Sequence, residues 1–274
     1  MTVLEDSFPE RRAPLWQMRL NDRQFAATGI FLCLSLAPTV AASLLEIRQF
    51  QGDNIWLKPI KFQIALSVYM ITLAFFSRWL PKGVLDQVRM RLFQKIVVFC
   101  IFGELIWIGG AAFLGTASHF NINTPLSGAL YGMMGAFAVT LTSASLVWGV
   151  AIARNPNTGL PRALHLGIAL GLILTFPLTL LTAGTMSSFP GHLVGEAITG
   201  ERLWLLGWSR EVGDLRAPHF LATHALHGIP LAALVAHLSL SPRTATRFTW
   251  AAALAYSGLT LWAFITALRG LPLI

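Results

Sequence analysis

Three histidines lie close together in one apolar stretch of the chain: His219, His224 and His227. Ionisable side chains are energetically costly inside a bilayer, so a cluster of them indicates a binding site, an ion pathway or a cofactor. On a helix His224 and His227 share one face, and His219 lies about 80° from His227. Imidazole is a good ligand for copper, zinc and iron. The spacing therefore predicts a metal site on this helix.

Further residues extend this prediction. We expect a copper, zinc or iron ion held by ligands drawn from His224, His227, His219, His119 and His192. Asp214 would orient His219 through a hydrogen bond, as carboxylates do behind metal-bound imidazoles. It could equally stabilise the start of the helix through the macrodipole. The competing interpretation of the histidines is structural: they hydrogen-bond to backbone carbonyls or to Ser and Thr on neighbouring helices.

Haem b is a second cofactor hypothesis. Ligation by two histidines requires residues on different helices at the same membrane depth. His165 and His237, near the ends of two consecutive apolar stretches, meet this requirement.

Two lysines and one glutamate are the other candidates for chemistry. Lys58 and Lys61 flank Pro59 and predict a positive site for an anionic group, although lysines at a membrane interface also extend toward water without binding anything. Glu104 lies within an apolar stretch, where a carboxylate must be protonated, paired or hydrated. It is a candidate for a proton path or for a hydrogen bond between helices.

The composition determines what kind of fold positions these residues. The chain has 274 residues, of which 55% are hydrophobic and 12% charged, whereas soluble domains carry about 25% charged residues. Its apolar residues occur in blocks of about 20 or more, enough to cross a hydrocarbon core. The net charge of +8 is spread over the short segments between these blocks, which is typical of membrane topology signals and not of nucleic-acid binding. We predict an all-α, polytopic transmembrane bundle in the lipid bilayer.

Seven membrane-spanning helices are predicted after a cytoplasmic N-terminal segment at residues 1–24, and all of them belong to one domain at 25–274. The spans are Phe25–Leu45, Phe62–Leu80, Ile96–Thr116, Ser127–Ala153, Ala163–Ser187, His219–Leu240 and Thr249–Leu268. With the N-terminus inside, 13 Lys and Arg residues fall on the cytoplasmic side and 7 on the outer side. The positive-inside rule thus predicts an N-in, C-out topology.

This topology places most of the candidate residues on one side of the membrane. Lys58 and Lys61, His119, and the long loop at 188–217 all belong to the outer side. Small residues should allow close helix packing, notably Gly128, Gly132 and Gly135 in the fourth span and Gly167 and Gly171 in the fifth.

Three segments carry a resemblance: Gly52-Asp-Asn-Ile-Trp-Leu-Lys-Pro-Ile-Lys-Phe62, Ser118-His-Phe-Asn121 and Gly213-Asp-Leu-Arg-Ala-Pro-His-Phe220. In these the chain resembles a group of bacterial multi-pass inner-membrane proteins of uncharacterised function. The resemblance implies a bacterial inner-membrane location, and it implies no activity or cofactor.

Three classes of function remain open from the sequence. The leading hypothesis is a histidine-rich pocket in the outer half that binds a metal ion or haem for redox or metal-assisted chemistry. The alternatives are a proton- or ion-coupled small-molecule transporter and a non-catalytic membrane subunit that packs on a partner protein or on a second copy. Whether the protein is an enzyme is left open.

Overall fold

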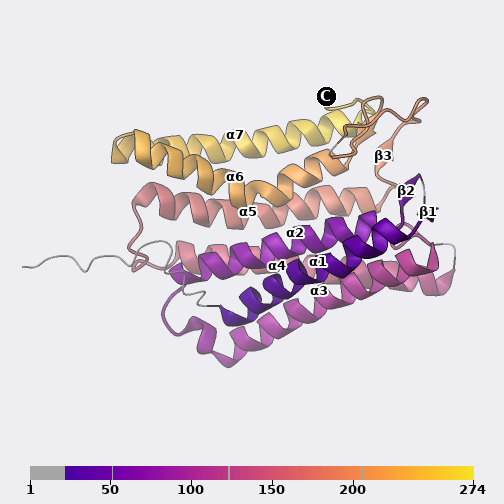
Figure 1. The fold of residues 1–274 in the computed structure, drawn as a ribbon. Helices are drawn as coiled ribbons and strands as arrows, with labels where there is room; N and C mark the ends of the chain where they lie inside the picture. Colours follow the sequence, from indigo (N-terminus) through magenta and orange to yellow (C-terminus); the bar gives the residue numbers. More distant parts are fainter. Residues whose placement is uncertain (1–21, 51, 123, 205) are drawn as a thin grey trace, which may run out of the picture.

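The protein is a bundle of long, roughly aligned helices (Figure 1). The computed structural model describes residues 22–274, apart from 51, 123 and 205. Seven of the described helices are long and apolar enough to cross a membrane, which makes this a multi-pass membrane protein and confirms the predicted all-α bundle with seven spans. They are α1 (Arg23–Leu45), α2 (Leu57–Phe76), α3 (Val88–Leu114), α4 (Pro125–Ala153), α5 (Arg162–Ser187), α6 (Arg216–Ser239) and α7 (Pro242–Leu268). The N-in, C-out orientation stays a prediction.

Two short strand pairs lie together at one end of the bundle, which we call the strand end (Figure 1). Antiparallel β1 (Gln49–Phe50) and β2 (Asp53–Asn54) form a hairpin between α1 and α2. Antiparallel β3 (Leu193–Val194) and β4 (Gly213–Asp214) organise the long connection between α5 and α6. Two 3₁₀ turns, Ser77–Trp79 and Val84–Asp86, connect α2 to α3.

Several helices extend beyond the predicted spans at their N-termini. α2 begins at Leu57 where Phe62 was expected, and α3 begins at Val88 where Ile96 was expected. The hydropathy pattern marks only the part of a helix that is apolar, whereas the backbone stays helical through its polar first turns. Lys58 and Lys61, predicted at a helix start, lie in the first turns of α2.

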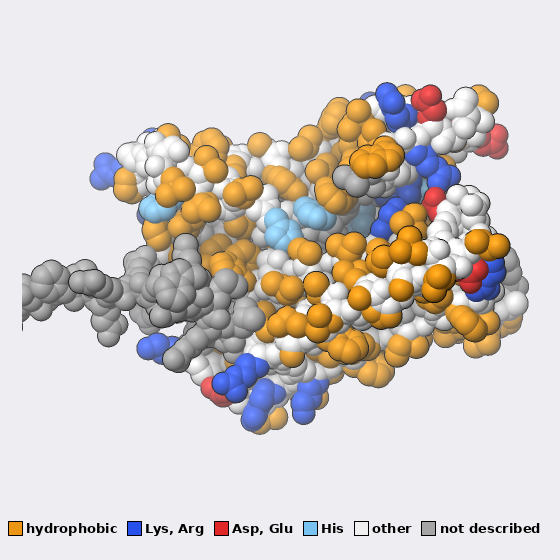
Figure 2. Space-filling model, in the orientation of Figure 1, with side chains coloured by type: hydrophobic (Ala, Val, Ile, Leu, Met, Phe, Trp, Pro, Cys, Tyr) orange, Lys and Arg blue, Asp and Glu red, His pale blue; other side chains and the backbone are white. Residues whose placement is uncertain are grey.

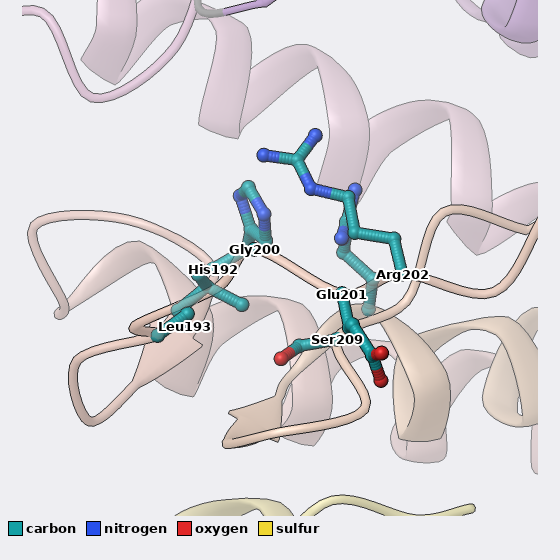
Figure 3. A pocket seen from close by; sticks show the side chains of 8 residues that line it. His192, Leu193, Gly200, Glu201, Arg202 and Ser209 are labelled. Carbon is teal, nitrogen blue, oxygen red and sulfur yellow. The ribbon is translucent and has the colours of Figure 1, made fainter.

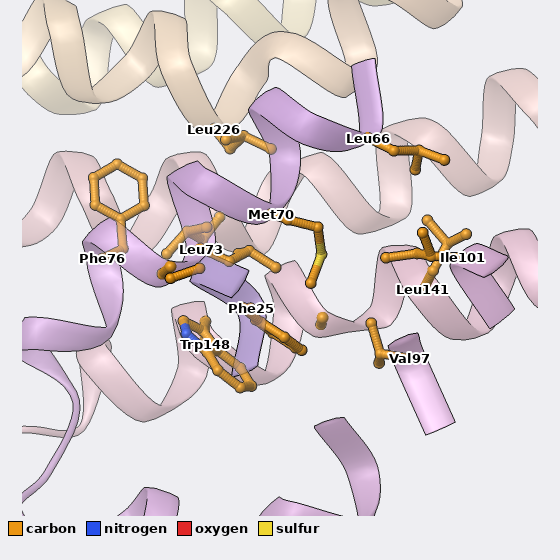
Figure 4. Packing of buried hydrophobic residues seen from close by; sticks show 14 of the residues in the cluster. Phe25, Leu66, Met70, Leu73, Phe76, Val97, Ile101, Leu141, Trp148 and Leu226 are labelled. Carbon is orange, nitrogen blue, oxygen red and sulfur yellow. The ribbon is translucent and has the colours of Figure 1, made fainter. Parts of the chain in front are cut away.

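The main hydrophobic core lies among α1 to α4 and reaches across to α5 and α6. Phe25 of α1 stacks on Trp148 of α4 with ring centroids 5.1 Å apart, and both side chains are fully buried. Figure 4 shows Met70 and Leu73 of α2 beside this pair. Leu226 of α6 belongs to the same cluster, so α6 also contributes to this core.

Small residues allow α5 and α6 to pack closely. A Cβ atom on Gly171 would lie 2.7 Å from Cδ of Pro230, and one on Gly167 would lie 2.3 Å from Cβ of Ala233. Neither glycine can take a larger side chain without displacing α6, because these distances are shorter than van der Waals contact. The predicted packing role of Gly167 and Gly171 is therefore confirmed.

The glycines of α4 behave differently from the prediction. No atom lies within 4 Å of a Cβ built on Gly128, Gly132 or Gly135, so they do not bring α4 close to another helix among the described residues. Periodicity identified a small-residue face correctly, but it carries no information on which neighbour that face meets. The predicted partner protein or second copy stays a prediction.

The end opposite the strand end holds a buried polar group. Asp22 caps α1 by accepting from the backbone N–H of Phe25, and its other carboxylate oxygen accepts from Nε2 of Gln94, 2.6 Å away. The hydroxyl of Ser77 accepts from the backbone N–H of Asp22. These bonds tie the start of α1 to α2 and α3 and offset the cost of burying a carboxylate.

Candidate functional site

His224 and His227 form the closest histidine pair, as their spacing predicted. Their ring centroids are 5.6 Å apart, and both side chains are half-buried. Phe220, one turn earlier, stacks on His224 with a centroid distance of 3.9 Å. Figure 2 shows His side chains on the surface midway along the molecule, flanked by hydrophobic ones. Partly exposed imidazoles in the middle of a membrane-spanning helix mark this place as unusual.

His227 also links α6 to α2. Its Nε2 lies 2.9 Å from the hydroxyl of Thr72. Its Nδ1 is buried and has no hydrogen-bond partner among the described residues. A buried polar atom without a partner costs about 1–3 kcal/mol, so this nitrogen is suited to bind something further.

His219 and Asp214 do not join this pair. The Nδ1 of His219 lies 3.3 Å from the hydroxyl of Thr182 on α5. Asp214 does not orient His219: its carboxylate accepts from the backbone N–H of Ser209 and from the guanidinium of Arg216, with the shortest distance 2.6 Å. The rotation of about 80° between His219 and His227 is enough to turn the two side chains toward different helices.

His119 lies at the strand end, bonded to Lys58. The Nζ of Lys58 is 3.2 Å from Nδ1 of His119, and the hydroxyl of Ser118 is 3.0 Å from the same nitrogen. Because an ammonium group can only donate, Nδ1 is the acceptor and the imidazole proton is on Nε2. The His119 ring also packs against Phe62 and Tyr131.

Burial, with a smaller contribution from the charge of Lys58, lowers the pKa of His119 to about 3. The folded protein therefore keeps this imidazole neutral, whereas the unfolded chain takes up a proton below about pH 6.5. Since the folded-state pKa is the lower one, acid favours the unfolded state. His119 alone should lower the stability by roughly 2 kcal/mol between pH 7.5 and pH 5.

We expect His119→Gln, which keeps an acceptor for Lys58, to show a flatter dependence of the apparent unfolding temperature on pH than the wild type does. The measurement is thermal unfolding of both proteins in detergent at several values between pH 7.5 and pH 5. Equal slopes in the two proteins would show that His119 takes up no extra proton on unfolding.

Glu104 lies deep in α3 and is only 3% exposed. Its Oε2 is buried without a hydrogen-bond partner among the described residues. Lys58 is near enough to interact with it electrostatically. The proton path predicted through Glu104 stays a prediction.

A small pocket lies under the α5–α6 loop at the strand end. It is lined by His192, Leu193, Ala197, Gly200, Glu201, Arg202, Ser209 and Arg216, and Figure 3 shows the labelled side chains around it. Its volume of about 30 Å³ accommodates water rather than a substrate. Burial, followed by the charge of Arg216, lowers the pKa of His192 to about 4, which keeps this imidazole neutral at pH 7.

Cationic side chains converge next to this pocket, at the turn around Gly207. A Cβ atom on Gly207 would lie 3.8 Å from Nζ of Lys61 and 4.0 Å from Nη1 of Arg216. Gly207 has a φ of +71°, a conformation that favours glycine, and its carbonyl accepts from the Arg216 guanidinium. Burial disfavours an ionised Asp214, but the bonds from Arg216 and Ser209 outweigh it and lower the pKa of this carboxyl group. Figure 2 shows Lys and Arg side chains in a recess near this end.

Neither lysine has a carboxylate partner: among the described residues, no ion pair includes Lys58 or Lys61. Arg216 pairs with Asp214, and Arg202 lies 3.8 Å from Asp53 of β2. The predicted anion-binding lysines thus carry positive charge that the described residues do not neutralise by direct pairing.

The loop itself is organised by one carboxylate. Glu211 accepts from the backbone N–H groups of Ile198, Thr199 and Glu201, and these bonds, those of Thr199 above all, lower its pKa to about 2. Of the two loop tryptophans, Trp208 is buried at 8% exposure and Trp204 is 96% exposed. Trp208 packs against Phe220 and so attaches the loop to α6.

The two histidines predicted for haem, His165 and His237, lie near the start of α5 and the end of α6, at the end of the bundle opposite the strand end. The Nε2 of His165 lies 2.6 Å from the backbone carbonyl of Ile152 on α4, which occupies one of its two ring nitrogens. Among the described residues, no hydrogen bond or ring contact joins His237 to His165. The haem hypothesis stays a prediction.

The five predicted metal ligands are therefore dispersed. His227 lies against Thr72 of α2 with His224 beside it on α6, His219 lies against α5, His119 beside Lys58, and His192 in the loop. Within residues 22–274 as far as the structure describes them, no group of three or more His, Cys, Asp or Glu side chains has a geometry that could hold a metal ion.

Three residues of this region were not singled out from the sequence: Thr72, Gly207 and Arg216. The only local signal was the Asp214-x-Arg216 spacing, which allows a carboxylate and a guanidinium to pair across a helix start.

Comparisons of the chain with protein-family models, with curated proteins and with solved structures find no match.

Proposed function

We propose that this protein binds a molecule with an anionic group, a phosphate or a carboxylate, at the strand end of its bundle. The observation that carries the proposal is the convergence of Lys61 and Arg216 on the Gly207 turn, with Lys58 one turn away on α2. Lysine and arginine together provide a point charge and a planar fork of donors, which is the usual combination for such anions.

Neutral donors and acceptors surround these cations. His119 lies against Lys58, and His192 lines the pocket that Arg216 also lines. Both imidazoles stay uncharged at pH 7, so they can orient a ligand by hydrogen bonds without adding charge. The positive-inside rule supports placing this end on the outer side of the membrane. The resemblance noted in the sequence supports a bacterial inner membrane.

The test is equilibrium binding to the purified protein in nanodiscs of neutral lipid, using glycerol phosphate and a phosphatidate as probes. We expect saturable binding of at least one probe, weakened by added salt because charged contacts at the surface are screened. Absence of saturable binding for both probes would contradict the proposal.

A metal ion between α2 and α6 is a second candidate, favoured by the unpartnered Nδ1 of His227 next to the His224 ring. On this hypothesis the purified protein contains copper, zinc or iron in near-stoichiometric amount. His227→Ala should remove most of it, and His237→Ala, at the other end of α6, should not. Elemental analysis measures both; a metal-free, folded wild-type protein would rule this candidate out.

A further inference from the structure

Helices α2 and α6 run in the same direction from the strand end and are connected at two levels. At the upper level, which is the one nearer the strand end, Lys61 and Arg216 both approach Gly207. At the lower level, Thr72 meets His227. Each helix has 11 residues from the upper level to the lower one, so the two helices are in register. The distance between the levels is about 16 Å at 1.5 Å per residue.

Helical periodicity places one stripe of each helix between these levels. We call the space between the two stripes the α2–α6 slot. Its residues are Lys61, Ala65, Val68 and Thr72 on α2 and Arg216, Phe220, Thr223 and His227 on α6. Among the described residues, no hydrogen bond, ion pair or ring contact joins α2 to α6 between the two levels.

The slot is closed at the back and open at the front. On the buried side, Leu226 of α6 belongs to the same core cluster as Leu66 and Met70 of α2, and all three side chains are buried. At the front, Val68 is 46% exposed and Phe220 37% exposed, and Ala65 is also exposed. Figure 2 shows this face of the molecule, where hydrophobic side chains surround exposed imidazoles. In a membrane, this open side faces the lipid.

The upper end of the slot is positive and the walls below it are mostly apolar. Such a site is complementary to an amphiphile that has an anionic head group and an apolar tail. The depth of about 16 Å corresponds to one leaflet of a hydrocarbon core that is about 30 Å thick. Gly207 and its loop lie over the upper end, between Lys61 and Arg216, so the open route into the slot is from the side.

We infer that the α2–α6 slot binds a membrane amphiphile with a phosphate head group, taken laterally from the outer leaflet. The head group lies on Lys58, Lys61 and Arg216, and the acyl chain lies against Val68 and Phe220. This inference rests on the proposed function and specifies its ligand: the anion is part of a lipid and not a free solute.

The experiment compares phosphatidate with glycerol phosphate, which carries the same anionic group without acyl chains. In neutral-lipid nanodiscs, we expect phosphatidate to bind at least 100-fold more tightly. Val68→Trp and, independently, Ala65→Trp should fill the slot and weaken phosphatidate binding at least tenfold, and should leave glycerol phosphate binding unchanged. The matched control is Leu254→Trp on α7, an exposed site that is not on α2 or α6.

The results distinguish lipid binding in the α2–α6 slot from anion binding at the strand end. Equal affinity for the two probes, or phosphatidate binding that neither tryptophan changes, would overturn the lipid inference and leave the anion site in place. If neither phosphatidate nor glycerol phosphate bound to the wild type, the anion site itself would be refuted. A retained elution profile on size exclusion establishes that each variant is folded; Val68 and Ala65 are exposed, so both substitutions should meet this condition.

Discussion

Replacing Lys58 and Lys61 together with alanine should lower the affinity for a phosphate-bearing ligand by about 100-fold or more. A hydrogen bond to a charged group contributes about 1.5–3 kcal/mol, and each 1.4 kcal/mol corresponds to a factor of ten in affinity. Neither lysine is engaged in an ion pair among the described residues, and the bond from Lys58 to His119 leaves other donors of its ammonium group for a ligand. The measurement is the dissociation constant for phosphatidate in neutral-lipid nanodiscs.

The matched control removes two lysines from the opposite end of the bundle. Lys82, between α2 and α3, and Lys95, near the start of α3, are both exposed. The Lys82→Ala/Lys95→Ala variant has the same net charge as the test variant but should bind as the wild type does. If the two double variants bound equally, the effect would come from overall charge, and the site at the strand end would be refuted.

Arg216→Met should destabilise the protein by about 3 kcal/mol. Removing one partner of a buried ion pair costs roughly 3–5 kcal/mol, because the remaining charge stays buried without compensation. We expect the lower end of this range, since the side chain of Arg216 is 31% exposed whereas that of Asp214 is only 3% exposed. The loss should appear as a lower apparent unfolding temperature and as faster proteolysis of the loop between β3 and β4.

A double variant identifies the cause of that loss. Adding Asp214→Asn to Arg216→Met removes the stranded charge and keeps a side-chain acceptor for the backbone N–H of Ser209. Most of the stability should return, while ligand affinity stays low because the guanidinium is still absent. Should the double variant be no more stable than Arg216→Met, the destabilisation would come from the lost hydrogen bond to the Gly207 carbonyl or from lost packing of the Arg216 stem, and not from the unpaired charge of Asp214.

The prediction of the membrane helices from sequence was correct in number, and most of their C-terminal ends agree to within a few residues. The apolar blocks determine this result, since a spanning helix must satisfy its own backbone and present apolar side chains over its whole length. The start of α3 was misplaced because Arg89, Arg91, Gln94 and Lys95 are polar yet helical. The hydropathy pattern identifies the apolar part of a helix and not the residue at which the helix begins.

The candidate site was predicted only as far as helix periodicity reaches. His224 and His227 are three residues apart, so their proximity follows from one turn of helix. His119 and Lys58 are 61 residues apart and meet because the α3–α4 connection folds back onto α2. For His219 and Asp214 the structure gives other partners: Thr182 on α5 for His219, and the neighbouring Arg216 for Asp214.

The sequence by itself determined that this is a seven-helix membrane protein with unusual polar residues near one end. It also determined that α5 carries glycines for close packing. The tertiary structure decided which of those polar residues meet. Lys61 and Arg216 are far apart along the chain and come together at the Gly207 turn, and Thr72 meets His227 further along the same two helices. Local patterns specify helices and their faces, but the pairing of faces depends on packing the whole bundle, which no local pattern encodes.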